Sequence, residues 1–314
     1  MKVGYFGLPL GAHLLLRDGH ELDPCVLSPL PGPGRRRVAA RVPTGALIDA
    51  LGAQKKELNQ AIEAALQRAQ PALIVSWFWT RLLPPAWLTA APYGGIGVHP
   101  SLLPRHRGPN PYFWSIDSGD QEAGVTLHTL APEYDTGTIL LQRAIPVSGR
   151  NSWQLARALD RPSLSLLREG VGCFARAQPP APTVQDEQAA TWAPEPTGRE
   201  LSVDWHWPTE RVLRRIRALS PVPGLAVEVS GLRFFVTRAE TATDFVSALE
   251  PGEAAVVGSP GTLTIRTANG AIAVQCATLT GEDEDEEGDE DEDAEDLDRG
   301  ALAHTVAKHL ARRG

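Results

Sequence analysis

Short apolar runs alternate with amphipathic stretches through the first third of the chain. Apolar runs at 2–6, 22–28 and 73–79 predict strands, and the last of them is apolar on both faces. Stretches at 12–17 and 55–70 carry the helical spacing of apolar residues. Strands that alternate with helices predict an α/β fold, with a Rossmann-like, mostly parallel sheet covered by helices on both faces.

Further strands are predicted at 96–98, 125–128 and 138–142. His99 directly follows the first of these strands, and Asp135 lies in the loop before the third. Ligands bind at the carboxyl ends of strands in parallel sheets, so His99 stands where chemistry is expected. Taken singly, His99 fits a structural histidine and Asp135 a turn residue. As a pair, an imidazole that accepts a proton and a carboxylate that stabilises the imidazolium suit acyl transfer to an amine.

The hydrophobic pattern changes in the second half of the chain. Residues 178–200 include a stretch rich in Pro, Ala and Gln, which predicts an interdomain linker after a catalytic domain at 1–177. A helix is predicted at 209–219, and five short alternating strands separated by glycine-containing turns follow it. Such strands predict a small C-terminal β-barrel of the OB-like kind, with its domain at 201–281.

The net charge of −8 is concentrated near the C-terminal end of the chain. Residues 282–298 hold 14 acidic and no basic residues, and 299–314 hold 4 basic residues, so the remainder is near neutral with 24 acidic and 26 basic residues. We expect 282–298 to be a disordered acidic segment and 299–314 to be a C-terminal helix. The acidic segment either raises solubility only, repels wrong nucleic acids or binds a basic partner.

Several classes of protein are disfavoured by the sequence. The apolar runs are too short to span a membrane, and no signal sequence precedes the first strand, so a cytoplasmic protein without a membrane partner is expected. Cys25, Cys173 and Cys276 are too widely spaced for a metal site or a disulfide framework, so reduced thiols and no metal are expected. The segment 7–11 lacks the three-glycine spacing of a nicotinamide site.

Several motifs taken together resemble a known family. The run 99–104 with Arg107-Gly108, then 124–126 and 135–137, is similar to the signature of the 10-formyltetrahydrofolate-dependent formyltransferases. The segment 216–224 resembles the one that opens the C-terminal barrel of methionyl-tRNA formyltransferases, and the resemblance covers about residues 1–281. It implies a Rossmann-like catalytic domain, 10-formyltetrahydrofolate as formyl donor beside the strand ends, and a barrel that helps hold acceptor RNA.

The same resemblance implies a catalytic trio of Asn, His and Asp. His99 and Asp135 match two of its members, but Gly97 stands where the family has Asn. The family's Asn donates a hydrogen bond to the oxyanion, and loss of such a donor costs about 10²- to 10³-fold in rate. A backbone N–H of Gly97 turned inward by its loop, or the amide of nearby Asn110, are the candidate substitutes. The enzyme is therefore slow, uses another donor or has lost activity.

Binding residues are implied by the resemblance as well. Trp77 and Phe78 either stack on the pterin ring of the folate or belong to the core. Arg35, Arg36 and Arg37 either contact the phosphates of tRNA or form a solvated basic loop. The folate-binding set is completed by Leu83, Ser101, Leu102, Leu103 and Pro104.

Four functions follow as hypotheses, with a monomer as the expected state. The first is transfer of a formyl group from 10-formyltetrahydrofolate to the amino group of methionyl-tRNA. The second is formylation of an amino-sugar nucleotide or another small amine. The third is a catalytically disabled protein that binds folate or RNA without transfer, and the fourth is a hydrolase that passes the formyl group to water.

Overall fold

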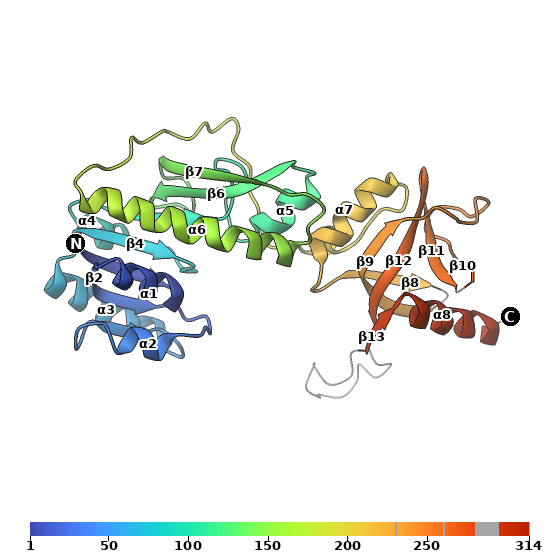
Figure 1. The fold of residues 1–314 in the computed structure, drawn as a ribbon, viewed down its shortest axis with the longest axis horizontal. Helices are drawn as coiled ribbons and strands as arrows, with labels where there is room; N and C mark the ends of the chain where they lie inside the picture. The colour runs from blue at the N-terminus through green and yellow to red at the C-terminus, as the bar shows by residue number, and fades with distance from the viewer. Residues whose placement is uncertain (230, 260, 280–294, 314) are drawn as a thin grey trace. The chain divides into compact units, whose positions relative to one another are not determined.

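The computed structural model describes residues 1–229, 231–259, 261–279 and 295–313, which fall into two compact units (Figure 1). Among these residues, none of the helices combines the length and the apolar character needed to cross a membrane. The first unit comprises Met1–Pro111, Glu122–Pro146 and Arg157–Ala193, and the second comprises Tyr112–Gln121, Val147–Ala156 and Pro194–Gly314.

The first unit is built on one sheet with the strand order β3-β2-β1-β4-β5-β6-β7. Strands β1 to β5 run parallel, whereas β6 and β7 run antiparallel to their neighbours. The predicted Rossmann-like, mostly parallel sheet is therefore confirmed. In the described part of the chain its seven strands are β1 (Lys2–Gly7), β2 (Glu21–Leu27), β3 (Leu47–Asp49), β4 (Leu73–Trp77), β5 (Gly95–His99), β6 (Glu122–Thr129) and β7 (Ile139–Pro146).

Helices cover both faces of this sheet, as the alternating pattern predicts. Helices α1 (Pro9–Arg17) and α6 (Ser152–Ala175) pack on the face that carries Trp77 and Leu127. The indole N–H of Trp77 donates to the hydroxyl of Ser163 on α6 at 2.8 Å. Helices α3 (Lys55–Ala69) and α4 (Pro85–Thr89) pack on the opposite face, and α2 (Arg35–Ala39) follows β2.

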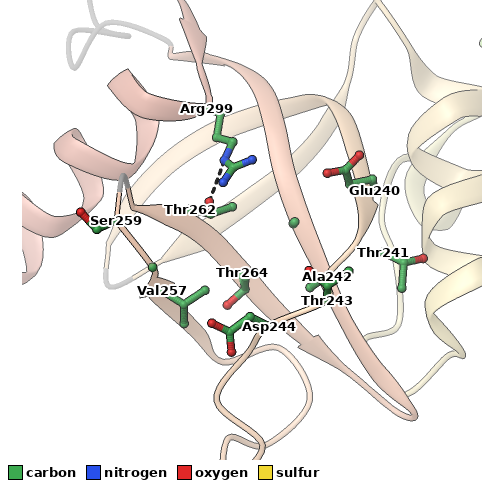
Figure 2. Close-up of a pocket in the computed structure, with 12 residues that line it drawn as sticks. Glu240, Thr241, Ala242, Thr243, Asp244, Val257, Ser259, Thr262, Thr264 and Arg299 are labelled. Carbon is green, nitrogen blue, oxygen red and sulfur yellow. Dashed lines mark hydrogen bonds between the residues drawn. The ribbon is translucent and has the colours of Figure 1, made fainter.

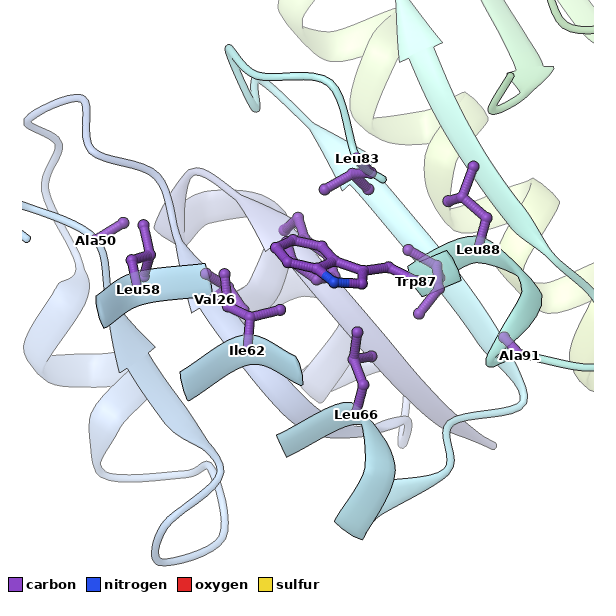
Figure 3. Packing of buried hydrophobic residues seen from close by; sticks show 11 residues of the cluster. Val26, Ala50, Leu58, Ile62, Leu66, Leu83, Trp87, Leu88 and Ala91 are labelled. Atoms are coloured by element: carbon purple, nitrogen blue, oxygen red, sulfur yellow. The ribbon is translucent and has the colours of Figure 1, made fainter. Parts of the chain in front are cut away.

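A buried cluster fixes α3 and α4 on the sheet. Figure 3 shows Trp87 of α4 among Ile62 and Leu66 of α3 and the side chain of Leu83. The Trp87 ring stacks on Phe6 of β1, with ring centroids 5.9 Å apart and planes at 23°. Burial of aromatic and branched side chains of this size contributes about 1.5 to 3 kcal/mol each, so the cluster anchors both helices.

The strand order reverses between β1 and β4, because the chain first builds outward to β3 and then returns to add β4 and β5. Such a reversal opens a crevice at the carboxyl ends of the two strands, where ligands bind in this class of sheet. Gly7 ends β1 at this point, and a Cβ there would lie 1.9 Å from the carbonyl oxygen of Trp77. Only glycine permits so close an approach of the two strand ends.

The second unit holds an antiparallel sheet with the strand order β10-β11-β12-β9-β8, to which β13 is added beside β12. This curled sheet confirms the small all-β part predicted for the C-terminal half (Figure 1). Its strands are β8 (Leu225–Val229), β9 (Leu232–Thr241), β10 (Ala254–Val257), β11 (Thr262–Thr267), β12 (Gly270–Leu279) and β13 (Glu295–Asp298). The second unit also contains the 3₁₀ helix η1 (Gly198–Leu201) and the α-helices α7 (Thr209–Leu219) and α8 (Arg299–Arg313).

A buried ion cluster ties two segments of the second unit together. Asp117, at the end of α5 (Pro111–Asp117), accepts hydrogen bonds from Arg215 of α7 at 2.7 and 3.0 Å. Arg211, one turn earlier on α7, donates to the same carboxylate at 2.9 Å. Asp117 is 3% and Arg215 5% exposed. Burial raises the pKa of Asp117, but the hydrogen bonds from both arginines outweigh it and hold that pKa below its ordinary value.

The end of the acidic segment differs from the expectation of disorder. Residues 282–294 lie outside the described residues, but 295–298 form β13 rather than a disordered tail. Leu297 is buried against the sheet, and the hydroxyl of Thr278 donates to Asp296 at 2.7 Å. The carboxylate of Asp298 accepts the backbone N–H groups of Gly300 and Ala301, which caps α8. One apolar residue and one cap thus order the end of an otherwise acidic run.

The segment expected to be a linker also differs from the expectation. Residues 178–193, called the strap below, belong to the first unit and lie against it without long regular secondary structure. The division between the units falls between Ala193 and Pro194, inside the range 178–200 that the composition marked. A Pro- and Ala-rich composition indicates irregular backbone, but it does not exclude packing.

The second unit contains a cavity of about 270 Å³ near β9, β11 and the start of α8 (Figure 2). Arg299 extends toward it and donates to the hydroxyl of Thr262 at 2.7 Å. Glu240 and Asp244 line the same space, so the cavity carries charges of both signs. All of its lining residues belong to the second unit, whereas His99 and Asp135 belong to the first.

Candidate active site

His99 is the last residue of β5, and its ring is buried at 7% exposure. Its Nε2 lies 2.7 Å from the carbonyl oxygen of His106, and its Nδ1 lies 3.4 Å from Oδ2 of Asp135. A carbonyl can only accept, so Nε2 carries a proton. In the neutral ring Nδ1 is then the basic nitrogen and faces a carboxylate, whereas in the imidazolium both contacts are favourable. The predicted pair is brought together, and this arrangement can take up and hold a proton.

Asp135 is oriented by contacts on both carboxylate oxygens. Oδ2 accepts the backbone N–H of Gly108 at 2.9 Å, and Oδ1 lies 3.7 Å from Nε2 of His128. The backbone of Asp135 has a φ of +59°, a left-handed conformation that aspartate tolerates better than most residues but that still needs support. The contact with Gly108 joins the loop after His99 to the loop that carries the carboxylate.

His128 is a second histidine at this carboxylate, and it is not among the site residues expected from the sequence. It lies on β6, is buried at 4% exposure, and its Nδ1 is 2.9 Å from the carbonyl oxygen of Thr129. Burial is the main cause that lowers the pKa of His128; the charge of Asp135 opposes it and that of His99 adds to it. His128 is therefore neutral near pH 7, with its proton on Nδ1. A histidine inside an apolar strand was the available signal.

Gly97 lies within β5, in register with Ser76 of β4 on one side and His128 of β6 on the other. The backbone N–H of a strand residue points in the plane of the sheet toward a neighbouring strand, so it is not turned over the face as a loop N–H would be. A Cβ on Gly97 would lie 2.9 Å from Cδ2 of Leu130 and 3.7 Å from Cβ of Ser76. Gly97 thus adds no side chain to the face that also carries His99, and the end of Leu130 lies beside it.

The strap holds the loop of Asp135 through Gln185, which is buried at 5% exposure. Its Nε2 donates to the carbonyl oxygens of Asp135 and Gly137, both at 2.7 Å. Its Oε1 accepts from Nε and Nη2 of Arg107 at 3.0 and 2.8 Å. Gly137 lies so close to Thr129 that a Cβ on Gly137 would be 1.7 Å from the carbonyl oxygen of Thr129. Both polar atoms of the Gln185 amide are therefore engaged, Nε2 with this turn and Oε1 with Arg107.

Further contacts of the strap reach the loop that follows His99. The backbone N–H of His106 donates to the hydroxyl of Thr191 at 2.8 Å, and that of Arg107 donates to the Thr191 carbonyl at 2.9 Å. Arg107 also forms an ion pair with Glu187, which lowers the pKa of this largely exposed carboxylate. The strap residues were missed because their local composition resembles that of a linker, although the polar run 185–187 within it was a signal.

The predicted folate-binding aromatic residues differ in their surroundings. Trp77 is 3% exposed with its indole N–H bonded, which supports the alternative that it belongs to the core. Phe78 is half-buried and meets Trp77 edge to face, with centroids 4.9 Å apart. Leu83 is buried in the cluster around Trp87. Among the described residues, the neighbouring Trp79 has a buried indole N–H without a hydrogen-bond partner.

The predicted residues of the loop after His99 hold the loop itself. The hydroxyl of Ser101 donates to the carbonyl of Arg105 at 2.7 Å, and the N–H of Leu103 donates to Thr126 at 3.1 Å. The carbonyl of Pro104 accepts the N–H of Thr191 of the strap at 3.3 Å. Leu102 is half-buried, and its side chain fills the space over Gly124.

The three predicted tRNA-binding arginines are not equivalent. The expected loop is helical from Arg35 onward, as α2. The guanidinium of Arg35 binds the carboxylate of Asp49 and the carbonyl oxygens of Ser28 and Leu30, so this side chain is committed to its own loop. Arg36 and Arg37 are exposed.

Asn110, the other candidate amide, is tied to the strap. Its backbone N–H donates to the carbonyl oxygen of Ala193 at 3.0 Å, and its side chain is half-buried. Over the same described ranges, no group of three or more His, Cys, Asp and Glu side chains is arranged to hold a metal ion.

Comparisons with known proteins agree with this architecture. Residues 25–160 match the family model described as formyl transferase, and 197–284 match the formyl transferase C-terminal domain. A methionyl-tRNA formyltransferase of Anaeromyxobacter dehalogenans is 34% identical over 83% of this chain and 86% of the relative. One of Latilactobacillus sakei is 32% identical over 78% of this chain and 79% of its own.

Solved structures share the fold. HypX from Aquifex aeolicus in complex with tetrahydrofolic acid superposes with a TM-score of 0.64 and 21% identity over 98% of this chain, which spans 48% of that protein. An N-formyltransferase from Helicobacter canadensis, in complex with folinic acid and dTDP-3-aminofucose, superposes with a TM-score of 0.64 and 13% identity, over 88% of this chain and 99% of that one. The family models and the curated relatives together show that this chain belongs to the formyl transferase family and is a formyltransferase, a one-carbon transferase.

Proposed function

We propose that this formyltransferase moves the formyl group of 10-formyltetrahydrofolate to the amino group of methionyl-tRNA. The observation that carries the proposal is the contact of 3.4 Å between His99 Nδ1 and the Asp135 carboxylate at the carboxyl end of β5. The choice of acceptor is supported by two relatives that are named methionyl-tRNA formyltransferase. They are 34% and 31% identical to this chain, and the match covers 86% and 93% of their own lengths. A curled C-terminal sheet in the matched domain adds support.

In the proposed reaction the amine nitrogen attacks the formyl carbon, and the bond from that carbon to the folate nitrogen breaks. The products are a formamide and tetrahydrofolate. The amine must lose a proton, and Nδ1 of His99 is the basic nitrogen that can hold it. The Asp135 carboxylate stabilises the imidazolium that results, and general base catalysis of this kind contributes about 10²- to 10⁴-fold.

The residues near the strand ends fit a folate. Its pterin ring offers carbonyl and nitrogen acceptors, and the buried indole N–H of Trp79 is a donor without a partner in the described part of the chain. Half-buried Phe78 supplies an aromatic surface beside it. We assign these two side chains to the pterin, with Trp77 and Leu83 as the packing behind them. The loop 101–104 then forms a wall of the site through its backbone.

Two arginines are expected to contribute to binding of the tRNA acceptor. The double variant Arg36→Ala/Arg37→Ala should raise KM for methionyl-tRNA and lower the salt dependence of binding, by up to about two in the logarithmic slope, with kcat preserved. Steady-state kinetics measure KM and kcat, and titrations of methionyl-tRNA binding at about 50 to 300 mM salt measure the salt dependence. The matched control is Lys55→Ala/Lys56→Ala, which removes the same charge from exposed positions at the start of α3. Equal slopes in the two double variants would exclude a phosphate contact by these arginines.

An amino-sugar nucleotide is the second candidate acceptor. It is favoured by the internal bonds of Arg35, which leave two exposed arginines in a short basic segment. Methionyl-tRNA and an amino-sugar nucleotide are to be compared side by side as acceptors, with tetrahydrofolate release as the readout. Formylated sugar without formylated methionyl-tRNA would overturn the first acceptor in favour of the second.

Gln185 is expected to position the Asp135 carboxylate. Gln185→Ala should lower kcat on the order of 10- to 100-fold with little change in KM, because a displaced catalytic group costs rate rather than binding. Gln185→Glu should lower kcat by a similar factor, since a glutamate can accept hydrogen bonds from Arg107 but cannot donate to the carbonyl oxygens of Asp135 and Gly137. Gln188→Ala, an exposed position of the same strap, is the control. Native kcat in Gln185→Glu would show that the donated bonds do not matter.

A further inference from the structure

Three neighbouring strands present a row of side chains in register on the face that carries His99. Ser76 of β4 is paired with Gly97 of β5, and Gly97 is paired with His128 of β6. Paired residues on adjacent strands point to the same face of a sheet, and His99 follows Gly97 by two residues, so it shares that face. The row therefore carries a hydroxyl, a position without a side chain beside the end of Leu130, and an imidazole, and its middle position lies two residues before His99 on β5.

Formyl transfer needs a hydrogen-bond donor at this face. When the amine attacks, negative charge develops on the formyl oxygen, and a fixed donor at that oxygen lowers the barrier. Gly97 supplies no side chain, and its N–H lies in the plane of the sheet. His128 does not supply a donor either, because its one proton is on Nδ1 and directed to the carbonyl of Thr129.

Ser76 has the properties that the missing donor requires. It is half-buried at the end of a central strand, and no side-chain hydrogen bond engages its hydroxyl within the described residues. Its Cβ lies 3.7 Å from the point where a Cβ on Gly97 would stand. The serine oxygen lies one bond beyond Cβ, so the hydroxyl can be directed from the next strand toward the space beside Gly97.

Resting on the proposed function, we propose that the hydroxyl of Ser76 donates the hydrogen bond that stabilises the formyl oxygen during transfer, in place of a side chain at Gly97. As the carbon–nitrogen bond to the amine forms, the carbonyl electron pair moves to the oxygen that Ser76 binds. When this pair returns, the bond to the folate nitrogen breaks and that nitrogen takes up a proton. The amine proton goes to His99, so Ser76 keeps its own proton throughout.

The first test compares three versions of the full chain with 10-formyltetrahydrofolate and methionyl-tRNA. Ser76→Ala should lower kcat by about 10²- to 10³-fold with KM for both substrates within a few-fold of native. Ser76→Thr, which keeps the hydroxyl and suits a strand, should restore most of kcat. A Ser76→Ala variant with native kcat overturns the proposal and leaves the proposed function intact.

A second pair of variants separates failure of this inference from failure of the function. Gly97→Asn added to Ser76→Ala should recover kcat, since the atom nearest to the new Cβ, at 2.9 Å, is the flexible end of the Leu130 side chain, which can move aside. If the native chain makes no formylated product but Gly97→Asn does, Ser76 is not an adequate donor and the inference is overturned. If neither forms product with any amine, the proposed function itself is overturned, and the inference with it.

A spectroscopic readout tests the hydrogen bond without turnover. The stable analogue 5-formyltetrahydrofolate, labelled with ¹³C at the formyl carbon, is bound to the native chain and to Ser76→Ala, and the infrared stretch of its carbonyl is recorded. A donor at the oxygen polarises the carbonyl, so the native complex should absorb at lower wavenumber. Equal stretching frequencies in the two complexes, with the analogue bound in both, would contradict the contact.

Discussion

Replacing His99 with alanine should lower formyl transfer by about 10²- to 10⁴-fold, the largest effect that we expect for a single side chain in this molecule. Nε2 of the ring is held by the His106 carbonyl and Nδ1 lies beside the Asp135 carboxylate, so in the proposed reaction alanine leaves the amine without a base. Single-turnover kinetics with saturating 10-formyltetrahydrofolate isolate the chemical step. Folate binding, measured separately by equilibrium titration, should change by no more than a few-fold.

Two further variants sharpen this test. Asp135→Asn keeps a hydrogen-bond acceptor for the N–H of Gly108 but removes the charge that stabilises the imidazolium, so it should also lose rate. His206→Ala, an exposed histidine of the second unit, is the control and should retain native kinetics. A His99→Ala rate within three-fold of native would remove this histidine from the mechanism.

Replacing Asp117 with alanine should reduce the free energy of unfolding of the second unit by about 3 to 5 kcal/mol. The change leaves Arg215 buried without its carboxylate partner, and Arg211 loses its partner as well. Urea unfolding followed by tryptophan fluorescence measures the loss. Asp18→Ala breaks a partly exposed ion pair with Arg168 and should cost no more than about 1 kcal/mol, which makes it the matched control.

The same carboxylate makes the stability of this unit depend on pH. The pKa of Asp117 in the folded protein lies below its ordinary value. The ionised carboxylate therefore stabilises the folded state in full at pH values above the pKa that Asp117 has in the unfolded chain. This stabilisation is lost as the pH falls through the lower pKa that Asp117 has in the folded state. The difference in unfolding free energy between native and Asp117→Ala proteins should therefore narrow in acid below about pH 4. A difference that stays constant through that range would contradict the assignment.

The sequence predicts regular elements well where local periodicity decides them. The helix predicted at 209–219 is α7 (Thr209–Leu219), and that predicted at 55–70 is α3 (Lys55–Ala69). The sequence predicts His99 and Asp135 as a pair of site residues, but the strand-end rule alone does not bring them together. Strand β6 runs antiparallel to β5 and ends beside Ile96, so the loop that carries Asp135 must return toward the carboxyl end of β5 to reach His99.

Features that depend on register or on contacts between distant segments could not be predicted. The row of Ser76, Gly97 and His128 exists only once three strands are aligned, and no local pattern records that alignment. Gln185 lies in a Pro- and Ala-rich stretch whose composition indicates irregular backbone and says nothing of what its side chains bind. Leu297 is buried and orders the end of an acidic run. The composition of that run is dominated by its acidic residues, so the contribution of one leucine could not be predicted from it.

The pairing of β12 with β13 has a consequence for how this protein can change. Leu279 and Glu295 are direct partners across the two strands, so the segment 280–294 joins two points that the sheet already holds together. The entropic cost of closing a loop rises by only about 0.6 kcal/mol for each doubling of its length. The free energy of unfolding should therefore depend only weakly on the number of residues between Leu279 and Glu295, and we expect this position to accept an exchanged peptide.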